Sequence, residues 1–312
     1  MSRVPSIRVS VIVPAFEARA FISRAIDSAL GQGLSELEVV VVDDASSDGT
    51  ADFVGSRYRD NPRVRVLRLR ENGGPARARN IAIDAAGGEW IAILDADDAW
   101  QPNRLSRLLL HSSEADAVFD NLAGYDAETG VMTGSLFPVF PEGPLTLASL
   151  LAPRISDSQF DFGYLQPILR RDFLTSRSIR YDETLRTSED LLLYLILILE
   201  GARTRMVDEA MYLYTMPVSA SKRRSPHSRT RPRDDEVGRA LERLLEEYRH
   251  QIDQATTTLF MQRIEYLRQI APVSEFYHAR HMRNYGRMAV LFARHVSVRR
   301  EIVAKAVARL SR

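Results

Sequence analysis

Short apolar runs alternate with stretches of helical periodicity through the first hundred residues of this 312-residue chain. β-branched runs of this length indicate buried strands, and the stretches between them place apolar residues at helical spacing. The pattern therefore predicts a mostly parallel sheet covered by helices. The expected strands are Val9–Pro14, Glu38–Asp43, Arg63–Leu69 and Glu89–Asp95. The expected helices begin near Ala18, Asp48 and Gly74.

The pattern is less regular after residue 115, where Gly and Pro become frequent. The segment from Asp116 to Pro144 predicts a strand at Ala117–Asp120 and then irregular or hairpin structure. Further helices are expected at Leu145–Leu151, Gln166–Ser176 and Glu189–Glu200. Further strands are expected at Arg205–Val207 and Met211–Tyr214.

A basic segment rich in Ser, Pro and Arg, residues 222–233, is typical of a mobile loop and marks a boundary. Residues 234–312 then show the periodicity of three or four helices, the last at Ser297–Arg312. In that last helix the apolar residues lie on one face. They are Val298, Ile302, Val303, Ala306 and Leu310. We expect a domain over residues 1–221, a loop over 222–233 and a helical region over 234–312.

Composition narrows the classes of function. With 45% hydrophobic residues the chain can bury a substantial core, and 42 Lys and Arg against 41 Asp and Glu give none of the basic surplus of a nucleic-acid binder. The chain has no Cys, so a metal would need oxygen or imidazole ligands. No apolar run approaches the ~18–20 residues of a membrane span. We therefore expect a soluble protein, or one attached at most to a membrane surface.

Three carboxylates follow the fourth expected strand, in Asp95-Ala96-Asp97-Asp98. Mg²⁺ commonly binds through one or two carboxylates together with substrate phosphates, so this arrangement suits a metal that bridges a diphosphate. The alternative is a turn followed by a helix N-cap, since Asp is favoured at both.

A second pair of carboxylates, Asp43 and Asp44, ends the second expected strand. At the carboxyl edge of a parallel sheet they would lie near Pro14 and the Asp95 segment, where they could accept hydrogen bonds from a nucleoside. Arg77 and Arg79, at the start of the Gly74 helix, could neutralise an anion there. The alternative is that they are solvated charges or partners of these acids.

Four motifs in this order and spacing resemble those of the family 2 inverting glycosyltransferases. They are Val11-Ile12-Val13-Pro14-Ala15-Phe16-Glu17, Val41-Val42-Asp43-Asp44-Ala45-Ser46-Ser47-Asp48-Gly49-Thr50, Asn72-Gly73-Gly74-Pro75-Ala76-Arg77-Ala78-Arg79-Asn80 and Leu94-Asp95-Ala96-Asp97-Asp98. The resemblance implies a GT-A fold, whose first half, residues 1–115, binds the nucleotide-sugar, and whose second half, residues 116–221, faces the acceptor. It also implies a donor that is usually a UDP-sugar, and a Mg²⁺ or Mn²⁺ ion.

The resemblance also implies which residues bind the donor and the metal. The expected donor-binding residues are Pro14, Ala15, Phe16, Glu17, Asp43, Asp44, Gly74, Arg77, Arg79, Asp95, Ala96, Asp97, Lys222 and Arg223. The expected metal ligands are Asp97, as the principal one, with Asp95 or Asp98. Lys222 and Arg223 would belong to a lid that orders over the donor phosphates, with a solvated loop as the alternative.

A weaker similarity extends from Gly163 to Asp190 and resembles bacterial exopolysaccharide enzymes of the succinoglycan type. It implies that an acidic residue of the pair Glu189-Asp190 opens the acceptor-side helix and acts as general base. By this match Asp190 deprotonates the acceptor hydroxyl, and one displacement inverts the anomeric configuration. Without the resemblance, Ser188-Glu189-Asp190 would predict only a helix N-cap with favourable charges.

These inferences predict a bacterial hexosyltransferase that acts in the cytoplasm on a saccharide acceptor, itself carried on a lipid diphosphate. The Ser297–Arg312 helix could contact an anionic membrane, or simply dock on its own domain. A catalytically idle scaffold of polysaccharide assembly and a nucleotidyltransferase are the alternative functions. The presence of both Asp97 and Asp190 argues against the first, and the lack of a Gly-rich phosphate loop after the first strand argues against the second. The sequence leaves the donor sugar and the linkage open.

Overall fold

A computed structural model describes residues 8–152, 161–216 and 233–310, with side chains to residue 304. The chain forms two compact units. The first comprises Met1–Leu150 and Arg154–Arg229, and the second comprises Leu151–Pro153 and Thr230–Arg312. Each unit is described by itself.

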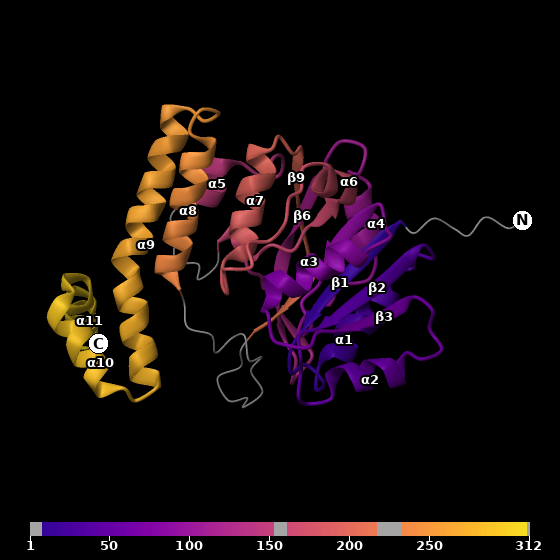
Figure 1. Ribbon diagram of the computed structural model, residues 1–312, viewed down its shortest axis with the longest axis horizontal. Helices are drawn as coiled ribbons and strands as arrows, with labels where there is room; N and C mark the ends of the chain where they lie inside the picture. The colour runs from indigo at the N-terminus through magenta and orange to yellow at the C-terminus, as the bar shows by residue number, and fades with distance from the viewer. Residues whose placement is uncertain (1–7, 153–160, 217–232, 311–312) are drawn as a thin grey trace, which may run out of the picture. The chain divides into compact units, whose positions relative to one another are not determined.

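A mixed sheet forms the centre of the first unit (Figure 1). Its strand order is β3-β2-β1-β4-β8-β6-β9-β5. One half of it is parallel and consists of β1 (Val9–Ala15), β2 (Leu37–Asp43), β3 (Val64–Arg68) and β4 (Trp90–Ile93). β2 is buried along its whole length and β1 along nearly all of it, which explains their continuous apolar sequences. The four expected strands of the first hundred residues are therefore present.

Three helices connect these parallel strands, as the periodicity predicted: α1 (Ile22–Leu30), α2 (Thr50–Arg57) and α3 (Pro75–Ala85). α1 buries Ile22, Ala25, Ile26 and Ala29, which recur at helical spacing. α3 begins with a Pro, whose missing N–H is tolerated at a first helical position.

The other half of the sheet differs more from the sequence prediction. It contains β5 (Ala99–Trp100), β6 (Ala117–Asp126), β7 (Val131–Ser135), β8 (Ile168–Arg170) and β9 (Thr204–Thr215). β6 and β7 form the hairpin expected in this region. β9 is one strand where two were predicted, because a register shift opposite Asp120 and Asn121 accommodates the polar residues that separate them.

The helix predicted at Gln166–Ser176 was wrong over its first part. Ile168–Arg170 pairs with both β4 and β6, and only α6 (Arg171–Ser176) is helical. Three residues are too few to show strand periodicity, and their place between two strands is a tertiary effect. Likewise, Ala99 and Trp100 form a strand too short to be predicted, which pairs with β9, and α4 (Arg104–Leu109) follows.

The remaining elements of this unit lie near the predicted positions. They are α5 (Leu147–Leu151) and α7 (Glu189–Leu199). A 3-10 turn at Phe162–Tyr164 was not predicted. α7 buries apolar residues on nearly all sides after its acidic first turn. That first turn is thereby fixed in position by the packing of the helix behind it.

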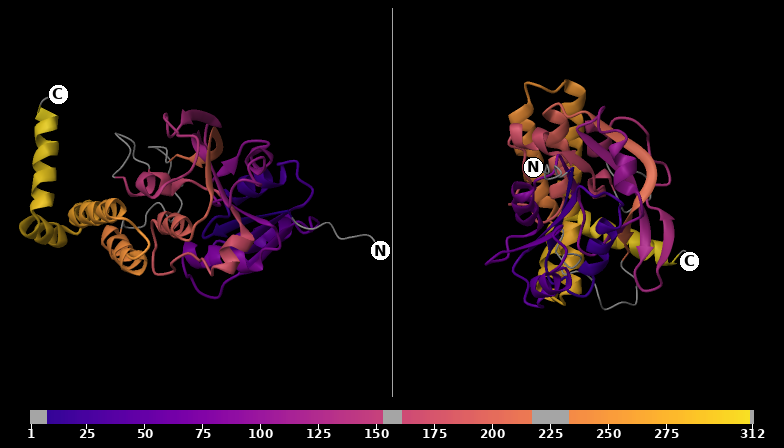
Figure 2. Two further views of the ribbon diagram at one scale, coloured as in Figure 1. Left: turned by 90° about the horizontal axis from the view of Figure 1, so that it is seen from above. Right: turned by 90° about the vertical axis from the view of Figure 1, so that its right-hand side faces the viewer.

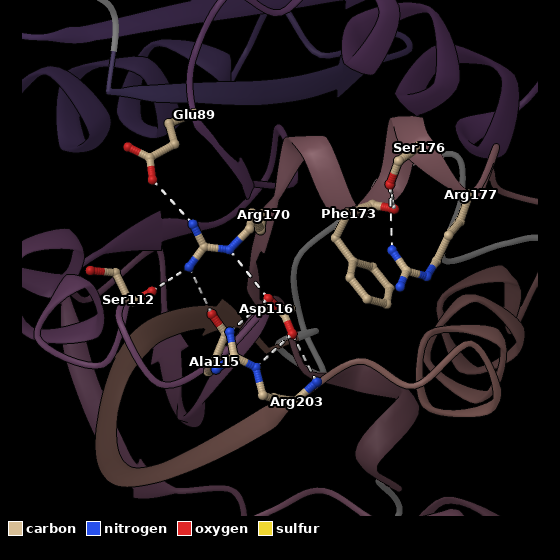
Figure 3. A network of polar contacts seen from close by, with 9 residues as sticks. All are labelled: Glu89, Ser112, Ala115, Asp116, Arg170, Phe173, Ser176, Arg177 and Arg203. Carbon is tan, nitrogen blue, oxygen red and sulfur yellow. Dashed lines mark hydrogen bonds and ion pairs between the residues drawn. The ribbon is translucent and has the colours of Figure 1, made fainter.

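A cluster of charged side chains lies at the edge of the sheet where β4, β6 and β9 begin (Figure 3). Asp116 accepts hydrogen bonds from Nε of Arg170 at 3.3 Å and Nε of Arg203 at 3.1 Å, and Arg170 also contacts Glu89 at 3.2 Å. Burial raises the pKa of Asp116, but the hydrogen bonds from Arg203 and Arg170 outweigh it and hold this pKa below its ordinary value. We call these four residues the Asp116 cluster.

The second unit contains four helices in its described part: α8 (Asp234–Tyr248), α9 (Gln254–His281), α10 (Tyr285–Arg294) and α11 (Val296–Leu310) (Figures 1 and 2). Asp253 caps α9 by accepting a hydrogen bond from the Thr256 N–H at 2.7 Å. Among the described residues, none of the helices combines the length and the apolar run that crossing a bilayer requires.

The apolar residues of the last helix, α11, do not all face the same way. Val298 is buried against Phe276 and Leu291, and Ile302 packs on the same group, whereas Val303 is 60% exposed. The first turns of α11 are therefore docked within their own unit, which was the alternative to membrane contact. Ala306 and Leu310 lie beyond the described side chains.

Candidate functional site

The predicted motifs meet at the edge of the sheet where β1, β2 and β4 end. Ala15 pairs with Asp43, and the Leu94 N–H donates to the Ile12 carbonyl at 3.1 Å. Ligands of parallel α/β sheets bind at this edge because the loops that follow the strands converge there. The segments that begin at Phe16, Asp44 and Asp95 all leave the sheet at this edge.

Asp44 organises the loop before α3. Its two carboxylate oxygens accept hydrogen bonds from the Gly73 and Gly74 N–H groups, each at 2.7 Å, and its side chain is buried. Gly74 has φ +90°, a conformation that favours glycine. Asp43 accepts a hydrogen bond from Ser46, and burial raises its pKa in spite of that bond. Asp44 is therefore a structural anchor of the loop whatever else it binds.

The segment after β1 is held to the segment after β2. Glu17 has φ 51° and accepts hydrogen bonds from the N–H and the hydroxyl of Ser47 at 2.7 and 2.9 Å. A left-handed conformation at a residue other than Gly costs free energy and occurs often at functional sites. Beside it, Phe16 exposes its ring, Pro14 is half-buried and Ala15 is buried.

The three carboxylates after β4 have three different environments. Asp95 contacts Nη2 of Arg79 at 2.7 Å and accepts from Nε2 of Gln166 at 3.3 Å. Asp98 is buried and accepts from the Tyr212 hydroxyl at 2.8 Å and the Thr215 N–H at 2.7 Å. Asp97 is half-buried, between two residues that are both buried, Ala96 and Asp98.

The environment of Asp98 is that of a structural group. Burial raises its pKa well above the ordinary value, and the nearby charges of Asp97 and Asp95 add to the rise. Both of its oxygens already have protein partners. Of the three expected metal ligands, Asp98 is therefore the least suited to a metal.

No group of three or more His, Cys, Asp or Glu side chains suitable for a metal occurs within residues 8–152, 161–216 and 233–310. A Mg²⁺ or Mn²⁺ ion held by one carboxylate and the phosphates of a substrate needs no such group. The donor set at Asp97, a single hard oxygen ligand at the sheet edge, fits that mode of binding.

Arg79 links the Asp95 segment to α7. Its buried guanidinium contacts Asp95 and Glu189 at 2.7 Å each and lies 3.8 Å from Asp190. Of the alternatives left open by the sequence, Arg79 is thus a partner of these acids. Arg77, two residues earlier, instead pairs with Glu71 at 3.1 Å on an exposed surface. We call Arg79, Asp95, Glu189 and Asp190 the Arg79 cluster.

Asp190 lies in the first turn of α7, and Ser188 before it has φ 60° and makes no side-chain cap. Oδ1 of Asp190 is buried and has no hydrogen-bond partner among the described residues. Burial raises the pKa of Asp190 to about 7 against the lowering effect of Arg79, and the charges of Glu189 and Asp95 add to the rise. A carboxylate with this pKa is suited to proton transfer near neutral pH.

Three further residues of this edge were not predicted. Arg24 of α1 donates to the Asp97 carbonyl and to the Thr215 hydroxyl, and its guanidinium lies 4.9 Å from the Tyr125 ring centroid. Gln166 is the partner of Asp95 described above. No local pattern distinguishes either residue, because each reaches the site from a distant part of the sequence.

The third unpredicted residue is Arg186, which lies against Gly74. A Cβ on Gly74 would come within 1.9 Å of Nη1 of Arg186. Arg186 is half-buried and forms no ion pair with a described residue. Its position four residues before Asp190 was the only sequence feature that could have drawn attention to it. Lys222 and Arg223, which were expected to form a lid, lie outside the described residues.

Comparisons with known proteins agree with this geometry. The model of the family described as glycosyl transferase family 2 matches residues 10–172. The succinoglycan biosynthesis proteins ExoO and ExoU of Rhizobium meliloti (strain 1021) are 38% and 36% identical to the chain. These matches cover 69% and 65% of the chain, but only 62% and 60% of the relatives, so the chain spans about three fifths of their length.

Solved structures show the same fold. Residues 1–349 of TarS from S. aureus, in complex with UDP-GlcNAc, match with a TM-score of 0.64 and 25% identity over 82% of this chain and 72% of that one. The mannosyltransferase PcManGT from Pyrobaculum calidifontis, in complex with GDP-Man and Mn²⁺, matches with a TM-score of 0.60 over 97% of this chain and 80% of that one. At 20% identity this second match bears on the fold alone. The predicted GT-A fold is confirmed.

Proposed function

Because the chain belongs to glycosyl transferase family 2, we propose that it transfers a sugar from a UDP-sugar to a hydroxyl of a growing bacterial exopolysaccharide, with inversion at the anomeric carbon. Two comparisons support this proposal. TarS was crystallised with UDP-GlcNAc, and ExoO and ExoU are named for succinoglycan biosynthesis.

One observation supports the chemistry most directly, namely the position of Asp190. It lies on the first turn of α7, close to the Asp95 segment, and Arg79 connects the two. A base in this position can serve an acceptor on one side while the donor occupies the edge of β1, β2 and β4. This separation is what a single in-line displacement requires.

In the proposed reaction the acceptor hydroxyl gives its proton to the Asp190 carboxylate. The acceptor oxygen then forms a bond to the anomeric carbon, and the bond from that carbon to the diphosphate oxygen breaks. UDP leaves with the electron pair of that bond. Because attack and departure occur on opposite faces, an α-linked donor gives a β-linked product. The raised pKa of Asp190 makes it a stronger base than an ordinary carboxylate.

Arg79 and Glu189 are positioning residues in this proposal. Three carboxylates surround one buried guanidinium, so their mutual repulsion is only partly neutralised. Arg79 stabilises the ionised carboxylate of Asp190 near pH 7. Glu189 fixes the orientation of Arg79 through the contact at 2.7 Å. Neither residue needs to touch a substrate.

Asp97 would hold a Mg²⁺ or Mn²⁺ ion together with the donor diphosphate, whose developing negative charge such an ion offsets. Arg24 keeps the backbone of Asp97 in place through the carbonyl contact. Arg186, at the Gly73-Gly74 loop, supplies a second positive charge for the diphosphate. Phe16 and Glu17, at the end of β1, would border the nucleoside together with Pro14 and Asp44.

The acceptor side of the proposal is a saccharide carried on a lipid diphosphate at the cytoplasmic face of a membrane. The sequence similarity to ExoO and ExoU supports an exopolysaccharide acceptor. The lipid carrier is an extension of that argument.

The test measures UDP release from a panel of UDP-sugars with Mn²⁺ and a saccharide acceptor, and determines the anomeric configuration of the product by NMR. We expect release with one or a few donors and a β-linked product. Asp190→Asn should lower the rate of transfer by about 10²- to 10⁴-fold and still bind UDP. A product with retained configuration would refute the inverting mechanism. Absence of UDP release with every donor and acceptor, from a protein that binds UDP, would favour a scaffold.

A further inference from the structure

Positive charge is concentrated in two parts of this chain, the basic segment 222–233 and the C-terminal end. Residues 276–312 contain nine Arg and Lys residues and one acidic residue, Glu301, a formal charge of +8. Residues 1–275 therefore carry −7, because the whole chain carries +1. From His281 to Arg300 the sequence has no acidic residue at all. A segregation of charge of this size favours an anionic partner for this end of the chain.

The inward faces of the last helices are already occupied. Phe276 of α9, Leu291 of α10 and Val298 of α11 form a small buried core. Val273, Tyr277, Met288 and Ile302 pack around it. This core fixes which side of α10 points outward, since Met288 and Leu291 define its inner side.

One exposed side of α10, next to this inner side, is apolar. Tyr285, Ala289 and Phe292 recur at positions i, i+4 and i+7 and are exposed, with Tyr285 at 71% and Phe292 at 43%. Met282 before the helix and Val296 after it are exposed as well. We call Tyr285, Ala289 and Phe292 the α10 stripe, and Met282 and Val296 lie close to it in the sequence. An apolar stripe of this length costs free energy in water unless something covers it.

The arginines close in sequence to the α10 stripe fall into two groups, those with protein partners and those without an ion pair to a described residue. Arg287 pairs with Glu275 at 2.6 Å, and Arg299 donates to the Phe292 and Ala293 carbonyls at 2.9 and 2.7 Å. By contrast, four other arginines are exposed and form no ion pair with a described residue. They are Arg280, Arg283, Arg294 and Arg300.

We propose that α10 is a membrane-binding helix, which lies in the interface of an anionic bilayer and inserts the α10 stripe among the lipids. An anionic bilayer offers an apolar layer and a plane of negative charge at once, so it satisfies the stripe and the four arginines together. Tyr and Phe are well suited to this boundary, and long Arg side chains can reach from it to the phosphates. From the sequence, Ser297–Arg312 was the helix that could contact a membrane. In the structure, Val298 and Ile302 of that helix pack in the small core.

This proposal does not depend on the proposed reaction, although a surface of this kind would bring the enzyme to a lipid-linked acceptor. Binding to vesicles is measured without any sugar donor. Turnover of a water-soluble acceptor is measured without vesicles. The two proposals can therefore fail separately.

The experiment is co-sedimentation of the full-length protein with vesicles of phosphatidylcholine, with and without phosphatidylglycerol. We expect binding to the anionic vesicles, weakening in high salt and at least about tenfold weaker binding to neutral ones. The double variant Tyr285→Ser, Phe292→Ser should bind the anionic vesicles about tenfold more weakly or worse, because its apolar contribution is removed. Its UDP release with a soluble acceptor should equal that of the wild type.

The matched control is Met261→Ser, which removes an exposed apolar side chain of α9 in the same unit. It should bind vesicles like the wild type. Equal binding by the double variant and the wild type would overturn the proposal, as would failure of the wild type to bind anionic vesicles. A dimer in solution that the double variant abolishes, without vesicle binding, would assign the α10 stripe to a second copy of the chain instead.

Discussion

The Arg79 cluster and the Asp116 cluster are both built from arginines and carboxylates, but the first has three carboxylates to one arginine and the second has two carboxylates to two arginines. The Arg79 cluster places three carboxylates around one buried arginine, at the edge where β1, β2 and β4 end. The Asp116 cluster places two arginines on one carboxylate, at the edge where β4, β6 and β9 begin. Burial raises the pKa of Asp190 to about 7, and the charges of Glu189 and Asp95 add to the rise, whereas the hydrogen bonds from Arg203 and Arg170 outweigh burial and lower the pKa of Asp116.

The difference separates a reactive site from a structural one. An excess of cations stabilises a carboxylate as a charged group, and such a group contributes to folding. An excess of carboxylates leaves one of them poorly neutralised, which costs stability but yields a base near neutral pH. The same two kinds of side chain thus stabilise the fold at one edge of the sheet and, in the proposed reaction, take part in catalysis at the other edge.

The largest expected effect follows from Asp190→Asn. We expect kcat to fall by about 10²- to 10⁴-fold, because the variant cannot accept the acceptor proton. The Kd for UDP, measured by calorimetry, should change little. The thermal midpoint should rise, since the neutral amide removes a buried charge. A folded variant with wild-type turnover would show that Asp190 is not the base.

The pH dependence of this stability gain has a definite sign. A raised pKa in the folded state means that Asp190 destabilises the fold progressively as the pH rises from its ordinary pKa of 3.8 to about 7. The gain in thermal midpoint from Asp190→Asn should therefore increase over this range and then level off. A gain that is constant with pH would contradict the raised pKa.

The activity of the wild type should also depend on pH near neutrality. Below pH 7 the Asp190 carboxylate becomes protonated, so kcat should fall by about tenfold per pH unit. An ordinary carboxylate would give this fall near pH 4 instead. The measurement is a pH profile of initial rates of UDP release. An acid limb near pH 4 would mean that the Arg79 cluster does not raise the pKa of its base.

Two arginines beside the Gly73-Gly74 loop provide a matched pair. Arg186→Ala should raise KM for the UDP-sugar about tenfold or more, because it removes a charge proposed to contact the diphosphate. Arg77→Ala should change KM by less than about twofold, since Arg77 forms an exposed pair with Glu71. Initial-rate kinetics of both variants give the two KM values for the UDP-sugar. Equal effects would remove Arg186 from the donor site.

The smallest effect on activity is expected from Asp116→Asn. This variant loses the charge that holds Arg170 and Arg203, so we expect a loss of about 1–3 kcal/mol in the free energy of unfolding. The kcat of the folded protein should stay within about twofold of the wild type, because the cluster lies at the opposite edge of the sheet. Urea denaturation and kinetics below the melting transition measure the two quantities. A large loss of kcat without a loss of stability would contradict a purely structural role for the Asp116 cluster.

Much of the fold could be predicted from the sequence. The strands β1 and β2 are long, β-branched and bounded by turns, and α1 repeats its apolar residues at helical spacing, so local periodicity was sufficient. β5 and β8 were missed for the opposite reason. Each has only two or three residues, and only their partners in the sheet make them strands.

The sequence by itself determined the family motifs, the carboxylates at the strand ends and the acidic start of α7. These features are local, since a strand end and a helix start can be recognised from a few neighbouring residues. Tertiary structure alone decided which carboxylate faces which cation. It brought Arg79 to Asp95 and Glu189, paired Arg77 with Glu71, and placed both oxygens of Asp98 on Tyr212 and Thr215. The charge around Arg79 and the burial of Asp98 depend on Glu189 and Tyr212, which lie more than a hundred positions away. No local pattern could therefore have distinguished Arg79 from Arg77, and only the family resemblance ranked Asp97 above Asp98.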